Sequence, residues 1–239
     1  MKKLVVITGA SSGIGSEMAI KFSGEGHPLL LLARRKEKME ALGLKNCICE
    51  GVDILDIESY KKAIAKAVDK YGPVDLLINN AGLMLLGEPT QQPIDEWHNM
   101  IDVNVKGVMN GITLVLDSMV KRNGGTIINI SSIAGRKTFP QHAAYCASKF
   151  AVHAISENLR EEVCDKNVRV IVIGPGVTQT ELLSHTTDEI IKSGYEEWKK
   201  EIGGAMSPSA TADTAYFVYN HPQNVCIREV LLAPTMQKC

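Results

Sequence analysis

The chain has 239 residues, with 27 acidic and 26 basic side chains that give a net charge of −1. A surface this close to neutral has no strong field to attract nucleic acid or an anionic membrane, and no apolar stretch approaches the ~20 residues of a membrane span. Hydrophobic residues make up 45% and charged residues 22% of the chain, as in ordinary globular proteins. The length fits one α/β domain covering residues 1–239.

The N-terminal region and the cysteines indicate the compartment. Residues 4–7 are the first apolar run, which is too short for a secretion signal and leads directly into a glycine-rich turn. Of the six cysteines, only Cys47 and Cys49 are close in sequence, and no second pair stands near them. We therefore expect reduced thiols, no bound metal and a cytoplasmic protein.

Short apolar runs alternate with helical patterns along the chain. Continuous apolar strands between helices predict a parallel sheet of seven strands with helices on both faces, that is, a doubly wound α/β fold. The predicted strands are 3–8, 28–33, 46–52, 74–79, 125–131, 168–173 and 225–232. The predicted helices follow Gly13, Lys36, Asp56, Pro93, Val105, Ala144 and Ser209.

A glycine-rich turn follows the first predicted strand. It comprises Thr8, Gly9, Ala10, Ser11, Ser12, Gly13, Ile14 and Gly15, and a helical pattern begins at Ser16. A strand, a glycine turn and a helix together are typical of a dinucleotide site, because glycines let the backbone approach a pyrophosphate and the helix N-terminus offers free N–H groups. The spacing is G-x-x-x-G-x-G rather than the common G-x-G-x-x-G. Residues 9–13 also fit the nucleophile elbow of α/β-hydrolases, but an elbow requires strands before it.

The end of the second predicted strand indicates which dinucleotide binds. Sheets that bind NAD place an acid there for the adenosine ribose, whereas this chain has Ala33 followed by Arg34 and Arg35. A charge-assisted contact from a guanidinium to a 2′-phosphate is worth roughly 1.5–3 kcal/mol, or roughly a 10- to 150-fold preference for NADP(H). Arg34 is the stronger candidate for this contact. The alternative is that both arginines form a solvated helix start.

Tyr145 and Lys149 stand four residues apart in a predicted helix, so the phenol and the ammonium point the same way. A nearby cation is expected to lower the tyrosine pKa from its usual ~10, and a phenol tuned in this way can exchange a proton with a substrate oxygen. Ser132 closes an apolar run upstream and can supply a hydroxyl to the same oxygen. Taken alone, the tyrosine and lysine would also fit two solvated helix residues.

Five ordered motifs, spread over nearly the whole chain, resemble those of the short-chain dehydrogenase/reductase family. They are the turn at residues 8–15, the run 79–82, Ser132, the Tyr145 and Lys149 pair, and Pro175-Gly176 with Thr180. Residues 26–35 and 224–229 look most similar to a bacterial group that includes a blue fluorescent protein that binds NADPH. The resemblance implies a Rossmann-type fold and a homodimer or homotetramer built on the helices after Val105 and Ala144.

The resemblance also implies roles for individual residues. Lys149 would hold the nicotinamide ribose, and Asn104 would kink its helix and anchor a water in a proton relay. Asp53 would reach the adenine amino group, unless it is only a loop acid or helix cap, and Thr180 would bond the nicotinamide carboxamide. The implied catalytic set is Asn104, Ser132, Tyr145 and Lys149. The implied NADP(H)-binding set is Gly9, Ser11, Ser12, Gly13, Ile14, Gly15, Arg34, Arg35, Asp53, Asn80, Ala81, Gly82, Tyr145, Lys149, Pro175, Gly176, Val177 and Thr180.

Residues 179–208 form a connection of unusual length after the sixth predicted strand. A long excursion at the carboxyl end of a parallel sheet is where a substrate lid would lie. Residues 189–201 have a partly helical pattern with Ile190 and Ile191 among its apolar positions. Leu182, Leu183, Tyr195, Trp198 and Phe139 suggest an apolar pocket, although ordinary packing would also account for them.

Two classes of function remain open. One is an NADP(H)-dependent oxidoreductase that interconverts an alcohol and a carbonyl in a small-molecule substrate. The other is an NADPH-binding protein, acting as a reservoir, sensor or fluorescent complex with weak or no turnover. Intact Asn104, Ser132, Tyr145 and Lys149 favour the enzyme, because binding alone needs no proton relay.

Overall fold

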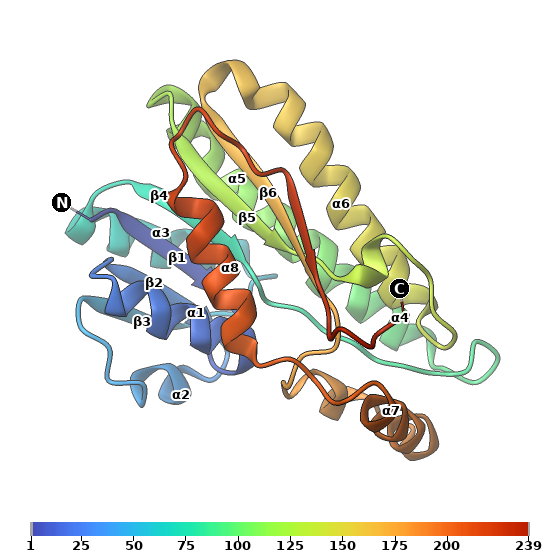
Figure 1. Ribbon diagram of the computed structural model, residues 1–239. Helices are drawn as coiled ribbons and strands as arrows, with labels where there is room; N and C mark the ends of the chain where they lie inside the picture. The colour runs from blue at the N-terminus through green and yellow to red at the C-terminus, as the bar shows by residue number, and fades with distance from the viewer. Residues whose placement is uncertain (1, 239) are drawn as a thin grey trace.

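The computed structural model describes residues 2–238, and seven strands of that part of the chain form one sheet (Figure 1). The strand order is β3-β2-β1-β4-β5-β6-β7, and each neighbouring pair is parallel. The predicted doubly wound fold is therefore confirmed. The strands are β1 (Leu4–Thr8), β2 (Leu29–Ala33), β3 (Cys47–Gly51), β4 (Val74–Asn79), β5 (Gly125–Ile130), β6 (Val168–Pro175) and β7 (Glu229–Leu232).

Helices cover both faces of the sheet, and the alternation of side chains along each strand supplies both layers of the core. In β1, Leu4 and Val6 pack with α3 (Ile57–Tyr71), α5 (Gly107–Lys121) and α6 (Ala143–Val163), whereas Val5 and Ile7 pack with the helices of the other face. Those helices are α1 (Gly13–Gly24), α2 (Lys36–Glu40) and α8 (Pro208–Asn220).

The position of β1 fixes the location of the site. After β3 the chain crosses to the other side of β1 and adds β4, so the direction of winding reverses between β1 and β4. Loops that leave the carboxyl ends of these two strands diverge to opposite faces, and ligands of open α/β sheets bind in the crevice between them. The glycine turn follows β1, and residues 80–83 follow β4.

The predicted helices after Pro93 and Val105 form one continuous rod. α4 (Ile94–Ile101) passes through a π-helical turn, Asp102–Lys106, into α5. Within residues 2–238, short 3₁₀ turns occur at Ile133–Gly135, Cys164–Lys166 and Leu182–His185. β7 is shorter than predicted, because residues 225–228 lie outside the sheet ladder.

Residues 179–208, which we call the α7 excursion, contain α7 (Glu189–Glu201), which lies beyond the carboxyl ends of the strands (Figure 1). Asp188 caps the helix by accepting from the Ile190 and Ile191 N–H groups. Ile191 is buried, but Ile190 is 85% exposed and does not contribute to a core as its apolar character suggested.

Three further observations concern residues 2–238. Across residues 2–238, no helix combines the length and apolar character needed to cross a membrane. Five cysteines are free thiols, and Cys239 lies outside the described residues. Among the described residues, no group of three or more His, Cys, Asp or Glu side chains is arranged to hold a metal ion.

Candidate active site

A cavity of about 1240 Å³ opens along the carboxyl ends of the strands. Its walls come from the glycine turn, the ends of β2, β4, β5 and β6, the start of α6 and the α7 excursion. The cavity is lined by every residue of the predicted cofactor-binding and catalytic sets except Gly15 and Asn104. One surface thus brings together motifs that are far apart in the sequence.

The glycine turn has a backbone that only small residues allow. Gly9 and Gly13 have φ of +66° and +53°, and a Cβ on Gly15 would lie 2.3 Å from the Gly9 carbonyl oxygen. Asn80 ties this turn to the end of β4, since its side-chain amide donates to the carbonyls of Thr8 (2.9 Å) and Gly9 (3.2 Å). The result is a fixed cradle of backbone N–H groups at the start of α1, which suits a dinucleotide pyrophosphate.

The hydroxyls of the glycine turn meet a cation from the next loop. Arg35 Nη2 donates to Ser11 Oγ at 3.3 Å and to Ser12 Oγ at 3.1 Å. Arg34 is exposed and lines the same cavity. Asp53 also lines it, and its Oδ1 accepts from the Leu55 N–H at 2.9 Å. A guanidinium with two hydroxyls beside it is a donor set suited to a phosphate.

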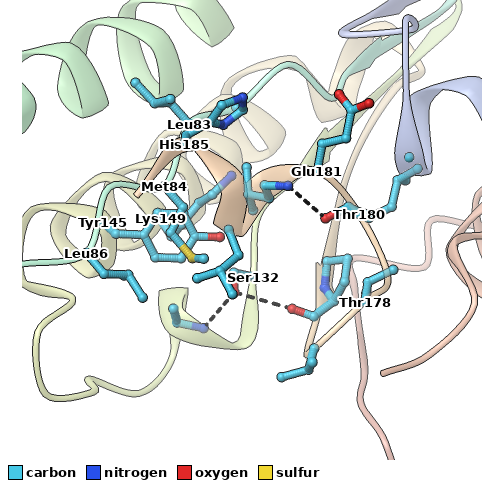
Figure 2. Close-up of a pocket in the computed structure, with 18 of the residues that line it drawn as sticks. Leu83, Met84, Leu86, Ser132, Tyr145, Lys149, Thr178, Thr180, Glu181 and His185 are labelled. Atoms are coloured by element: carbon cyan, nitrogen blue, oxygen red, sulfur yellow. Dashed lines mark hydrogen bonds between the residues drawn. The ribbon is translucent and has the colours of Figure 1, made fainter. Parts of the chain in front are cut away.

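Tyr145 and Lys149 project from the first turns of α6 toward the cavity, and Ser132 lies opposite them at the end of β5 (Figure 2). Lys149 is 5% exposed; its ammonium donates to the Ile130 carbonyl at 3.1 Å and lies 5.7 Å from the centre of the Tyr145 ring. Ser132 Oγ donates to the Pro175 carbonyl at 3.3 Å and accepts from the Ala134 N–H at 3.1 Å.

The direction of the Tyr145 pKa shift corrects the sequence-based expectation. Burial raises the pKa of Tyr145 to about 12, although the hydrogen bond with Ser132 opposes the rise. Burial also lowers the pKa of Lys149 to about 8. The expected lowering of the tyrosine pKa assumed that the attraction of the cation exceeds the cost of desolvating the phenolate. In this site the desolvation is larger.

Asn104 lies in the π-helical turn between α4 and α5. Its side chain accepts from the Leu83 N–H at 2.7 Å and donates to the Leu83 carbonyl at 2.8 Å and to Ser148 Oγ at 2.9 Å. A Cβ on Gly82 would lie 3.4 Å from Asn104 Oδ1 and 3.6 Å from Lys149 Nζ. π-Helical turns are frequent at functional sites, and this one fixes the segment that passes beside Lys149.

The segment after β6 closes the cavity. β6 ends at Pro175, beyond the predicted end at Ile173, and the Val177 N–H donates to Gln237 Oε1 at 3.0 Å. Thr180 Oγ1 accepts from the Leu182 N–H at 3.3 Å. A Cβ on Gly13 would lie 2.9 Å from Thr180 Cγ2, so the start of the α7 excursion rests directly on the glycine turn.

Comparison with known proteins establishes the family. The family model described as short chain dehydrogenase matches residues 3–190. The chain belongs to the short-chain dehydrogenase/reductase family. An uncharacterised oxidoreductase of Staphylococcus saprophyticus is 39% identical over 98% of this chain and 97% of that relative. The family predicted from the five motifs is thereby confirmed, and the chain is an oxidoreductase of this family.

Solved structures of dehydrogenases have the same fold. The closed form of serine dehydrogenase complexed with NADP⁺ is similar with a TM-score of 0.90 and 30% identity, covering 99% of this chain and 96% of that one. An alcohol dehydrogenase from the archaeon Thermococcus sibiricus, complexed with 5-hydroxy-NADP, is similar with a TM-score of 0.87 and 26% identity, covering 100% and 99%. The family fold therefore extends through the α7 excursion.

Several residues of this short-chain dehydrogenase/reductase site were not found from the sequence. The His142 ring lies 6.2 Å from the Tyr145 ring and 6.3 Å from the Tyr195 ring, and burial lowers the pKa of His142. Met84 and Leu86 belong to a buried apolar cluster with Tyr145. His142 could have been found from its position three residues before Tyr145, but residues 83–86 lie outside helices and strands and have no periodic signal.

Sequence reasoning also missed Glu181. It directly follows Thr180, and its carboxylate meets Arg35 Nη2 at 2.8 Å and Lys38 Nζ at 3.1 Å. These two hydrogen bonds lower the pKa of Glu181 to about 2. The only signal in the sequence is an acid next to a predicted cofactor-binding threonine.

Proposed function

We propose that this short-chain dehydrogenase/reductase interconverts an alcohol and a carbonyl compound with NADP(H), using Tyr145 as the general acid and base. The observation that carries the proposal is the buried pair of Tyr145 and Lys149 beside Ser132, on the wall of the cavity that the glycine turn also lines. A buried ammonium is costly for a fold to hold. A role at the site is a physical reason for retaining it.

In the reducing direction, Tyr145 donates its proton to the substrate oxygen as that oxygen gains charge, and Ser132 Oγ orients the same oxygen. A phenol with a raised pKa is protonated at neutral pH, which is the form that reduction needs. The Lys149 ammonium opposes the cost of the phenolate left behind. When bound, NADP(H) supplies or accepts the hydride. In the oxidising direction, Tyr145 as phenolate removes the alcohol proton.

Asn104 acts as a positioning residue in this proposal. Its side chain forms hydrogen bonds with both the N–H and the carbonyl of Leu83, and these bonds fix the path of residues 80–83 past Lys149. The relay water that the family resemblance implies would be anchored at the same amide. Lys149 would hold the nicotinamide ribose hydroxyls, and Thr180 the carboxamide.

The preference for NADP(H) is supported by the end of β2. Ala33 stands at the end of β2 where an acid would repel a 2′-phosphate, and the guanidinium of Arg35 lies within hydrogen-bond distance of Ser11 and Ser12. Arg35 is therefore our first candidate for the phosphate contact, with Arg34 beside it. Asp53 lines the same cavity, and we assign to it the contact with the adenine amino group.

The substrate is proposed to be a small carbonyl compound or alcohol with an apolar body. The cluster around Tyr145 is built from Met84, Leu86, Ile191 and other apolar side chains, with Phe139, Leu182, Leu183 and Tyr195 packed against it. His142, whose pKa is lowered, adds a neutral imidazole at neutral pH. The α7 excursion would act as the lid over this pocket.

A panel of apolar aldehydes and ketones, with hydroxy acids for comparison, tests the proposal when the oxidation of NADPH and of NADH is followed by absorbance. We expect turnover of apolar carbonyls with a preference for NADPH. Tight binding of NADPH without turnover of any compound would instead support a binding protein. Turnover confined to charged hydroxy acids would contradict the proposed substrate class.

We also propose a homo-oligomer built on α5 and α6. Apolar side chains of α5 such as Val108 and Met119 belong to the core of the subunit. Met109 on α5 and Phe150 on α6 do not, being 49% and 42% exposed. Light scattering is expected to give a dimer or tetramer at micromolar concentration, and a monomer would contradict it.

A further inference from the structure

An ion cluster joins the proposed phosphate end of the cavity to the α7 excursion. The Glu181 carboxylate lies 2.8 Å from Arg35 Nη2 and 3.1 Å from Lys38 Nζ. Arg35 comes from the loop after β2 and Lys38 from α2, whereas Glu181 begins the turn Leu182–His185 of the excursion. Segments more than 140 residues apart are thus held together by one carboxylate.

The carboxylate and the two serine hydroxyls share one nitrogen atom. Arg35 Nη2 is the donor to Ser11 Oγ, to Ser12 Oγ and to Glu181 Oε2. An anion that bound to this guanidinium and these hydroxyls would therefore lie at close range to a second anion. Two like charges this close repel each other. The phosphate and the Glu181 carboxylate therefore cannot both bind Arg35 as strongly as either would alone.

We propose that Glu181 is a residue that determines cofactor specificity, because it competes with the 2′-phosphate of NADP(H) for Arg35 and Lys38. The inference rests on the proposed NADP(H) function. NAD(H), which has no 2′-phosphate, leaves the Glu181 contacts in place. NADP(H) must displace the carboxylate, so Glu181 reduces the affinity for NADP(H) without reducing that for NAD(H).

The displacement reaches the substrate pocket through the chain itself. Glu181 stands between Thr180, which rests on Gly13, and Leu182 and Leu183, which pack against the apolar cluster of Tyr145. Figure 2 shows Thr180 and Glu181 on the same loop segment, to one side of the Tyr145 and Lys149 pair. Release of Glu181 removes one attachment of the excursion, so the choice of cofactor alters how firmly the pocket wall is held.

The expected size of the effect is moderate. The side chains of Arg35, Lys38 and Glu181 are 42%, 45% and 44% exposed. Exposed ion pairs are each worth little, and two of them correspond to a change in affinity of about three- to tenfold. A fully buried cluster would have changed it by far more.

The experiment measures the adenosine end alone, with 2′,5′-ADP and 5′-AMP as ligands in calorimetric titrations of the full chain. Glu181→Gln keeps the shape of the side chain and removes its charge. We expect this variant to bind 2′,5′-ADP about three- to tenfold more tightly than the wild type, with the affinity for 5′-AMP unchanged. Glu189→Gln is the matched control, since Glu189 is an acid of the same excursion that pairs with Lys192, and it should change neither affinity.

The outcomes separate this inference from the proposed function. If the wild type prefers 2′,5′-ADP and Glu181→Gln leaves that preference unchanged or weakens it, Glu181 does not compete and the inference is overturned while the cofactor proposal stands. If the wild type binds both ligands equally and Glu181→Gln gains a preference for 2′,5′-ADP, competition is supported and the proposed preference of the wild type is wrong. If neither protein prefers 2′,5′-ADP, both are overturned.

Discussion

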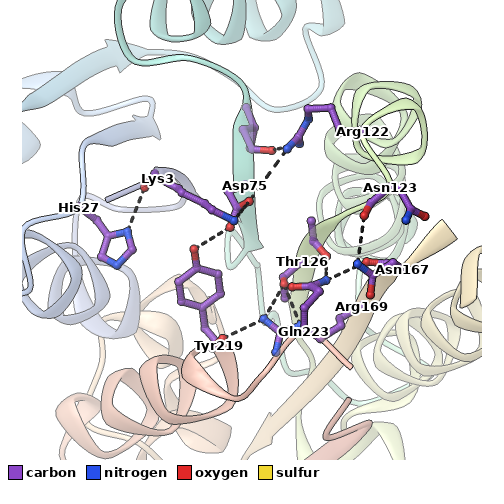
Figure 3. Close-up of polar contacts among 12 residues, drawn as sticks. Lys3, His27, Asp75, Arg122, Asn123, Thr126, Asn167, Arg169, Tyr219 and Gln223 are labelled. Carbon is purple, nitrogen blue, oxygen red and sulfur yellow. Dashed lines mark hydrogen bonds and ion pairs between the residues drawn. The ribbon is translucent and has the colours of Figure 1, made fainter. Parts of the chain in front are cut away.

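The two ends of the sheet each contain a buried cation, but the two cations differ in the number of hydrogen-bond acceptors around them. At the amino ends, Arg169 on β6 is 4% exposed and donates to Thr126 Oγ1 and to the carbonyls of Tyr219 and His221 (Figure 3). At the carboxyl ends, Lys149 is 5% exposed, and its ammonium donates to the Ile130 carbonyl. Both side chains are exposed to a similarly small degree, but only Arg169 has several fixed acceptors.

The rest of the amino-end cluster follows the same pattern as Arg169. Asp75 accepts from Lys3 Nζ at 2.9 Å and from Tyr219 Oη at 2.7 Å, and Arg122 Nη2 donates to the Val74 carbonyl at 2.6 Å. Asp75 on β4 and Arg169 on β6 both bond to Tyr219 of α8, so they join the sheet to this helix (Figure 3). A buried charge with many fixed partners, such as Arg169, stabilises the fold. A buried charge with few partners beside a cavity, such as Lys149, is available for chemistry.

The largest expected effect is at the carboxyl end. Tyr145→Phe should lower turnover by roughly 10²–10⁴, the usual contribution of a positioned general acid, and leave NADPH affinity nearly unchanged. Steady-state kinetics on a substrate from the panel, with NADPH titrations alongside, measure both. Tyr216→Phe removes a phenol that bonds Glu25 away from the cavity and should leave turnover intact. Full activity of Tyr145→Phe would mean that another group supplies the proton.

A substitution at the amino ends of the strands should lower the stability of the protein and leave its turnover unchanged. Arg169→Met is expected to reduce the free energy of unfolding by about 2–4 kcal/mol, because it leaves several buried acceptors without a donor. Urea unfolding measures the loss, and the activity per folded molecule should be unchanged. Lys121→Met, which removes an exposed cation of α5, should cost less than about 1 kcal/mol. A selective loss of turnover in Arg169→Met would contradict the division between the two ends.

Lys149→Met should stabilise the protein while it damages both turnover and NADPH binding. The pKa of Lys149 is about 8 in the folded chain against an ordinary 10.5. Between these values the unfolded chain binds more protons, so the stability of the wild type rises with pH through this window. Below about pH 8 the folded chain bears the full cost of burying the charged Lys149. Removal of this charge should raise the free energy of unfolding by up to about 3 kcal/mol.

Urea unfolding at several pH values tests the prediction for Lys149. The stability advantage of Lys149→Met over the wild type should be constant below about pH 8 and shrink toward pH 10. An advantage that does not change with pH would show that packing, and not the buried charge, is responsible. A variant less stable than the wild type at neutral pH would show that Lys149 stabilises the fold as Arg169 does.

The smallest expected effect concerns the cofactor phosphate. Arg35→Ala should lower the preference for NADPH over NADH about tenfold, in line with the loss of one charge-assisted contact. Arg34→Ala should have a smaller effect, because it is Arg35 whose guanidinium meets Ser11 and Ser12. Dissociation constants for both cofactors, measured by fluorescence titration, decide between the two arginines. The reverse ranking would support the original preference for Arg34.

Local pattern in the sequence was sufficient for the fold and for most of the residues that line the candidate site. Continuous apolar runs such as that of β1 predicted a sheet buried on both faces, and the glycine spacing predicted the turn at Gly9 and Gly13, because both depend on backbone geometry within a few residues. The four-residue spacing of Tyr145 and Lys149 placed both on one face of α6. These features follow from the periods of the strand and the helix and need no knowledge of distant contacts.

The tertiary structure decided whatever depends on desolvation or on residues distant in sequence. The pKa of Tyr145 rises because the surrounding cluster excludes water, and the number of groups that bury a phenol cannot be read from its neighbours in the chain. Arg35 rather than Arg34 meets the serines because of the course of one loop. Glu181 lies against Arg35 only because the chain returns after β6 to the glycine turn, and such a contact between distant segments leaves no periodic signal in the sequence.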